Sequence, residues 1–225
     1  GGSDKNLDIF SVSNKEELQE YVSNNKIESY GFDEDVAYIR DIKIFDKTAD
    51  IEFLMTDDVV DEIDVYFTLF QIGMDEEYEN DTDVSDDTVE YQFTDKDKEQ
   101  INKSFEIIKT SFGDYLGCSF EKYDVIPIEN SESLENNEEN FYAGKFLKEY
   151  SVRDKDGVLW IMRFEASYGS ATMVIYKLVD ESGFDNFIPS IDLTKWFTDR
   201  NFMEANYVFC EAKKWYYYCF CIADV

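Results

Sequence analysis

The stretch that decides the fold is Val36–Ile72, VAYIRDIKIFDKTADIEFLMTDDVVDEIDVYFTLFQI. It holds three runs rich in β-branched and aromatic residues, Val36–Phe45, Asp50–Thr56 and Ile63–Ile72. Such residues fit a pleated, half-buried surface, so each run predicts a β-strand. Asp46–Ala49 separates the first two runs with polar and small residues, which indicates a hairpin turn. The stretch therefore predicts an antiparallel sheet.

Two helices flank this sheet in the sequence. Ser13–Asn24 predicts a short helix, in which Ser13 and Glu16 form a capping box. Thr94 and Asp97 cap a second, clearer helix. Its apolar residues at helical spacing are Ile101, Phe105, Ile108 and Phe112. Gly113 is expected to end this helix, since glycine is the usual residue just past a helix end. We expect the second helix to cover the first sheet.

The second half of the chain repeats the pattern of strands followed by a helix. Asp154–Gly157 is a strong hairpin signal between two of the strands. The expected strands are Tyr123–Ile128, Lys145–Arg153, Val158–Ala166, Thr172–Val179, Tyr207–Ala212 and Trp215–Ile222, and the expected helix is Ile191–Ala205. We therefore predict the α+β class, with antiparallel sheets formed by two meanders, each covered by a helix.

The chain length of 225 residues allows one large domain or two small subdomains. The polar, acidic segment 129–140 (ENSESLENNEEN) is expected to be a loop or a linker. It would separate an acidic α+β half, residues 1–128, from a β-rich half with one helix, residues 141–225.

Charge is the most unusual property of this sequence. The net charge is −30, and residues 1–117 hold 32 acids against 10 bases. Thr48–Asp95 contains 17 carboxylates and no Lys or Arg. Binding to nucleic acid or to anionic membranes needs basic residues, so neither is an expected partner. The longest apolar run, Trp215–Ala223, is too short to span a bilayer. A basic protein is the expected partner.

The centre of the acidic region is Asp75–Asp87 (DEEYENDTDVSDD), which lacks apolar periodicity and predicts a mobile loop. Tyr78 stands inside it as a candidate aromatic anchor. The candidate partner-binding residues are Asp57, Asp58, Asp61, Glu62, Asp75, Glu76, Glu77, Tyr78, Glu79, Asp81, Asp83, Asp86 and Asp87.

Sequence signatures of catalysis and of metal sites are weak. The chain has no His, which excludes Ser-His-Asp and Cys-His mechanisms. No glycine-rich phosphate-binding motif occurs. Glu79, Asp81, Asp83 and Glu90 fall at calcium-loop spacing, but Val84 stands where the turn of an EF-hand needs Gly. We expect no catalytic residues, no metal and no cofactor.

Charge and size resemble those of immunity proteins of nuclease toxins and of nucleic-acid-mimicking inhibitors. We expect a non-enzymatic inhibitor that covers the basic surface of a nucleic-acid-handling partner, such as a nuclease or toxin. An intracellular adaptor or structural domain is the alternative. A metal-dependent hydrolase or a sugar-binding module is less favoured. Four cysteines without the dense spacing of a disulfide framework are typical of a cytoplasmic protein.

Overall fold

The computed structural model describes residues 5–72, 92–128, 134–167 and 169–182. By its internal contacts the chain divides into two units, Gly1–Asp180 and Glu181–Val225, and the elements below belong to the first. In chain order they are η1 (Lys5–Ser11), α1 (Lys15–Asn24), β1 (Tyr30–Phe32), β2 (Val36–Ile44), β3 (Lys47–Thr56), β4 (Val59–Gln71), α2 (Asp95–Leu116), β5 (Tyr123–Pro127), α3 (Glu138–Tyr142), β6 (Phe146–Arg153), β7 (Leu159–Ser167) and β8 (Ser170–Leu178).

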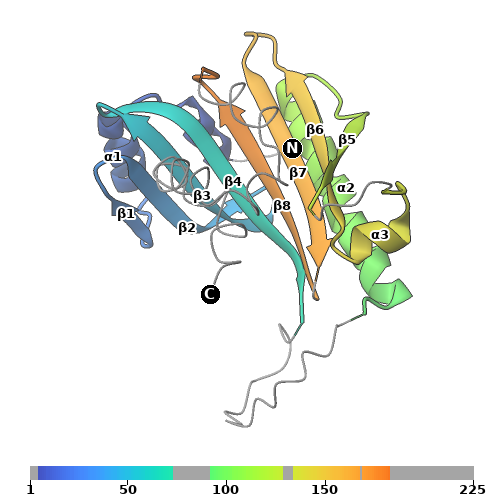
Figure 1. Ribbon diagram of the computed structural model, residues 1–225. Coiled ribbons are helices and arrows are strands. Elements are labelled where there is room, and N and C mark those ends of the chain that lie inside the picture. Colours follow the sequence, from blue (N-terminus) through green and yellow to red (C-terminus); the bar gives the residue numbers. More distant parts are fainter. Residues whose placement is uncertain (1–4, 73–91, 129–133, 168, 183–225) are drawn as a thin grey trace, which may run out of the picture. The chain divides into compact units, whose positions relative to one another are not determined.

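The described strands form one eight-stranded sheet in the order β1-β2-β3-β4-β8-β7-β6-β5, and neighbouring strands are antiparallel (Figure 1). The α+β class is thus confirmed. The prediction of separate sheets, each with its own helix, is not confirmed, because β4 pairs with β8 along most of its length. This pairing joins two strands that are separated by 98 residues in sequence, since β4 ends at Gln71 and β8 begins at Ser170.

The described helices pack on one face of the sheet, which we call the helix face. Phe10 of η1 contacts Trp160 of β7 edge to face, with ring centroids 5.6 Å apart. Phe105 of α2 stacks on Phe164 of β7 at 4.0 Å, and Phe141 of α3 lies 4.7 Å from the same ring. The alternation of side chains along the strands explains this arrangement, since every second residue of β7 faces these helices. The core therefore lies between the helices and the sheet.

Of the two predicted N-terminal helix caps, the structure changes the first and confirms the second. The N-cap of α1 is Asn14, whose side chain accepts from the Glu17 N–H, while Glu17 Oε2 accepts from the Ser13 N–H and hydroxyl. The predicted pair of Ser13 and Glu16 was therefore wrong by one residue. The capping box of Thr94 and Asp97 on α2 is confirmed.

The predicted end of α2 at Gly113 is wrong. The helix continues to Leu116 and ends at Gly117, which takes the left-handed conformation with φ 70°. Gly113 has another role, because a Cβ there would lie 2.7 Å from the Cys118 carbonyl oxygen. The chain folds back over the helix end, and the Cys118 N–H donates to the Gly113 carbonyl at 3.0 Å.

Two turns are tighter than the sequence suggested. Phe45 and Asp46, with φ 49° and 61°, form the β2–β3 turn in place of Asp46–Ala49. Asp57 and Asp58, with φ 50° and 64°, form the β3–β4 turn. Aspartate tolerates this conformation better than most residues. Strand β4 consequently begins at Val59 rather than at Ile63.

Several predictions fall on residues outside the described ranges. They are the loop Asp75–Asp87, the helix Ile191–Ala205 and the strands Tyr207–Ala212 and Trp215–Ile222. The division of the chain at residues 129–140 stays a prediction. The strands on either side of that segment, β5 and β6, pair with each other.

The β6–β7 turn is held by Asp154. Its Oδ1 accepts from the N–H groups of Asp156 and Val158 at 2.9 and 3.0 Å, and its Oδ2 accepts from Trp160 Nε1 at 3.0 Å. Partial burial opposes ionisation of this carboxyl. The three hydrogen bonds and the charge of Lys177 outweigh that effect and hold the pKa of Asp154 below its usual value.

We expect Asp154→Ala to lower the free energy of unfolding by about 2 kcal/mol at pH 7, because it leaves the buried Trp160 N–H without its acceptor. A carboxyl whose pKa is lowered on folding contributes stability above its unfolded pKa of about 4 and loses it as the pH falls through the folded pKa. The difference between wild type and Asp154→Ala should therefore shrink toward pH 3 in urea titrations. Asp156→Ala, an exposed change in the same turn, should stay within about 0.5 kcal/mol of wild type. An equal loss in both variants would contradict this assignment.

Candidate functional site

Exposed and half-buried carboxylates from several segments gather at one end of the sheet. Hydrogen bonds place these segments side by side: the Met55 N–H donates to the Asp35 carbonyl at 2.8 Å, and the N–H groups of Val179 and Asp180 donate to the Asp61 carbonyl at 2.9 Å. We call this group the acidic end. Its members are Asp33, Glu34, Asp35, Asp57, Asp58, Asp61 and Asp180.

Three of the sequence-predicted residues belong to the acidic end. Asp57 and Asp58 occupy the exposed β3–β4 turn, and Asp61 follows in β4, half-buried, with its carboxylate 2.5 Å from the Thr56 hydroxyl. Lys15 approaches Asp58 at 4.0 Å, a distance at which an exposed ion pair contributes little. The structure thus places these three carboxylates on one surface.

The other four members of the acidic end are not among the residues predicted from the sequence. Asp33, Glu34 and Asp35 make up the β1–β2 turn, and Asp180 follows β8. A local acidic run, DED, was visible in the sequence at 33–35. Its position beside Asp57 follows only from the β2–β3 register, in which Val36 pairs with Leu54.

The predicted loop residues are attached at the other end of the sheet. Strand β4 starts at the acidic end and runs 13 residues to Gln71, which corresponds to about 40 Å of extended chain. Asp75, Glu76, Glu77, Tyr78, Glu79, Asp81, Asp83, Asp86 and Asp87 follow that far end and lie outside the described residues. The candidate residues therefore divide into two groups along the chain, not one.

Glu62 differs from the other candidate residues because it is buried. It is 1% exposed, and Asp64, two residues further along β4, is 0% exposed. Both belong to the sheet face opposite the helix face, since side chains alternate along β4 and Phe67 of this strand contacts Phe112 of α2. The sequence analysis began the strand at Ile63, and so took Glu62 for part of the preceding linker.

The opposite face carries further ionisable groups around these carboxylates. The Tyr66 hydroxyl donates to Glu52 Oε2 at 3.2 Å. Burial first, and then the charges of Asp64, Glu52 and Glu62, raise the pKa of Tyr66 far above its usual value. Arg163 Nε donates to Glu149 Oε2 at 2.7 Å. A tyrosine held neutral in this way donates a hydrogen bond and does not serve as a base.

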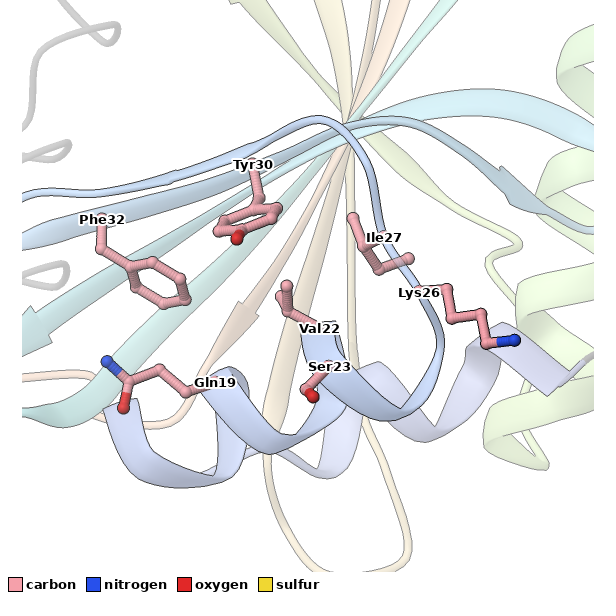
Figure 2. A pocket seen from close by; sticks show the side chains of 7 residues that line it. All are labelled: Gln19, Val22, Ser23, Lys26, Ile27, Tyr30 and Phe32. Atoms are coloured by element: carbon pink, nitrogen blue, oxygen red, sulfur yellow. The ribbon is translucent and has the colours of Figure 1, made fainter.

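A groove lies between α1 and the edge strand β1, with a volume of about 440 Å³ (Figure 2). Tyr30 and Phe32 of β1 reach toward α1, and Val22 and Ile27 complete its apolar lining. Gln19, Ser23 and Lys26 also line it. Tyr30 is 47% exposed and so presents part of its ring to a ligand in the groove.

Metal and thiol chemistry find little support in the part of the chain that the structure describes. No group of three or more Asp, Glu or Cys side chains there is arranged to hold a metal ion. Burial raises the pKa of the Cys118 thiol, whereas a nucleophilic cysteine needs a lowered one. None of the described helices is both long and apolar enough to cross a bilayer.

Comparison with known proteins identifies no relative of this chain. No family model, no curated protein and no solved structure matches it.

Proposed function

We propose that this protein is a non-enzymatic inhibitor that binds the basic surface of a nucleic-acid-handling protein, such as a nuclease or toxin. The observation that supports this most is the acidic end, where turns distant in sequence present carboxylates together. A partner that binds nucleic acid carries Lys and Arg positioned for phosphates. An array of carboxylates on ordered turns can bind those same groups and exclude the nucleic acid.

A fixed backbone is the property that separates this surface from a merely solubilising one. Asp57 and Asp58 occupy a two-residue turn between long paired strands, and the backbone carbonyl of Asp35 accepts a hydrogen bond from the Met55 N–H. A backbone that is ordered before binding loses less conformational freedom on binding, so more of the attraction contributes to affinity. The net charge of −30 adds long-range attraction for a basic protein.

Competition with nucleic acid tests this proposal. The partner is captured from the source organism on immobilised protein at low salt and eluted with high salt. A labelled duplex bound to that partner is then titrated with the protein while fluorescence anisotropy is followed. We expect the duplex to be released at about one equivalent of protein, since both ligands need the same basic groups.

A control titration contains the duplex and the protein without the partner. Its anisotropy should stay unchanged, because the protein is too anionic to bind nucleic acid. A ternary complex, in which the duplex stays bound to the partner beside the protein, would exclude the inhibitor function.

A further inference from the structure

We propose that the groove between α1 and β1 receives an extended segment of a basic partner protein, which adds a strand to the sheet at β1. This inference rests on the proposed function for the charge of the partner, and it assigns the binding mode and a second surface.

The backbone of β1 has hydrogen-bonding groups directed away from the sheet. The Asp33 N–H donates to the Val36 carbonyl at 2.8 Å, and the Arg40 N–H donates to the Ser29 carbonyl at 3.0 Å. In an antiparallel pair such bonded positions alternate, so Gly31 directs its N–H and C=O toward β2. Tyr30 and Phe32 then direct theirs outward. Among the described strands, β1 pairs with β2 alone.

The side chains of the same two residues line the groove. Tyr30 pairs with Ile39 and Phe32 with Ala37, which places both on the helix face. Their rings meet edge to face with centroids 5.7 Å apart. Figure 2 shows both rings above α1, over Val22, Ser23 and Gln19. An added strand could therefore bond to the backbone and place an apolar side chain in the groove, which is the usual mode of β-strand addition.

Close packing keeps β1 in position for this role. Tyr38 of β2 lies directly against Gly31, so that a Cβ on Gly31 would meet the Tyr38 ring at 2.4 Å. Glycine allows the aromatic ring to cover the opposite face of β1. Arg40 in turn lies 4.9 Å from the centroid of the Tyr38 ring. Although β1 is only three residues long, the Tyr38 ring packs against the face of β1 that points away from the groove.

The negative charge near the groove favours a basic segment as its ligand. Exposed acids that lie within three positions of a lining residue along the chain include Glu16, Glu20, Glu28, Asp33, Glu34 and Asp35. Lys26 is the only base among the lining residues, and it lies at the end of the groove away from Phe32 (Figure 2). The basic residues of the segment should therefore lie next to the Asp33–Asp35 turn. A second copy of this chain is disfavoured as the occupant, since each copy carries a net charge of −30.

A synthetic peptide tests the site without a native partner. The probe is the blocked peptide KKTVFVTKK, titrated into the full-length, ¹⁵N-labelled protein at low salt. We expect chemical-shift changes at the amides of Tyr30 and Phe32 and at the groove residues. The same peptide with Glu in place of Lys should bind at least about tenfold more weakly, because it is repelled. The peptide KKTVPVTKK, which lacks the central N–H donor and aromatic ring, should also bind weakly.

Two matched variants of α1 test whether the peptide binds in the groove. Ser23 and Asn24 are neighbouring, exposed residues, but only Ser23 lines the groove. Ser23→Tyr should fill the groove and raise the Kd of KKTVFVTKK about tenfold, whereas Asn24→Tyr should change it less than about twofold. Both changes leave the charge unaltered.

Three outcomes would overturn the proposal. The first is the absence of shift changes at Tyr30 and Phe32, or an unchanged Kd in Ser23→Tyr. The second is slow amide exchange at Tyr30 and Phe32 without peptide in a monomer, which would show an occupant from within the chain. The third is a concentration-dependent dimer that protects these amides.

The two proposals can fail separately. If the peptide binds at Tyr30 and Phe32 while the captured partner keeps its duplex, the inhibitor function is wrong and the groove is still a binding site. If the partner releases its duplex and the Ser23→Tyr variant binds that partner normally, only the groove proposal is wrong.

Discussion

Neutralising four carboxylates of the acidic end should slow association with the basic partner about tenfold at low salt. The variant is Asp33→Asn, Glu34→Gln, Asp57→Asn and Asp58→Asn. Attraction between opposite charges raises association rates well above those of neutral partners, and the acidic end concentrates that attraction. Asn tolerates the left-handed conformation at positions 57 and 58, so the turn should persist. Stopped-flow or surface-based kinetics measure the rate.

The matched control removes the same charge from another part of the structure. Asp114, Glu121, Asp124 and Glu135 are exposed and lie outside the acidic end. Neutralising them should slow association less than about threefold, since only the long-range contribution of net charge is lost. Equal slowing by both sets would mean that net charge alone acts. A third set, Asp75→Asn, Glu76→Gln, Glu77→Gln and Glu79→Gln, measures the contribution of the acidic loop independently.

Phe112→Ala should lower the free energy of unfolding by about 3–5 kcal/mol, the largest stability effect we expect from one substitution. Phe112 of α2 is 0% exposed. Its ring centroid lies 4.8 Å from Phe45, 5.7 Å from Phe10 and 6.3 Å from Trp160. The substitution leaves a cavity where α2, η1 and the sheet meet. Urea titration followed by circular dichroism measures the loss.

Ile107→Ala is the control on the same helix, because Ile107 is 41% exposed. It should cost no more than about 0.5–1 kcal/mol, as expected for an exposed position. A similar cost for both variants would mean that α2 contributes through helix formation rather than through packing on the sheet.

Local sequence patterns predicted most individual elements correctly. The apolar spacing from Ile101 to Phe112 gave the buried stripe of α2, and the β-branched runs gave strands β2, β3 and β4 with shifts at their ends. These features depend on residues that are close in sequence. Residue propensity and the spacing of apolar residues are therefore enough to predict them. Errors arose where tertiary contacts decide, as at Gly113, where the Cys118 carbonyl closes over the helix.

Arrangement between distant segments could not be predicted from such patterns. The pairing of β4 with β8 makes one sheet of what looked like two. The acidic end exists because the β2–β3 register and the β8 terminus bring Asp35, Asp57 and Asp180 together. Glu62 was assigned to the surface because net charge gives no information on which face of a strand a residue occupies.

The most direct test of the central claim, that charge complementarity drives binding, is the association rate of the unaltered protein with its captured partner at two salt concentrations. Ions shorten the reach of electrostatic attraction from about 10 Å at 0.1 M to about 3 Å at 1 M salt. We predict that the association rate falls at least about tenfold between these conditions, while the dissociation rate changes much less. An association rate that stays within about twofold would contradict the claim and leave the carboxylates of the acidic end without a role in recognition.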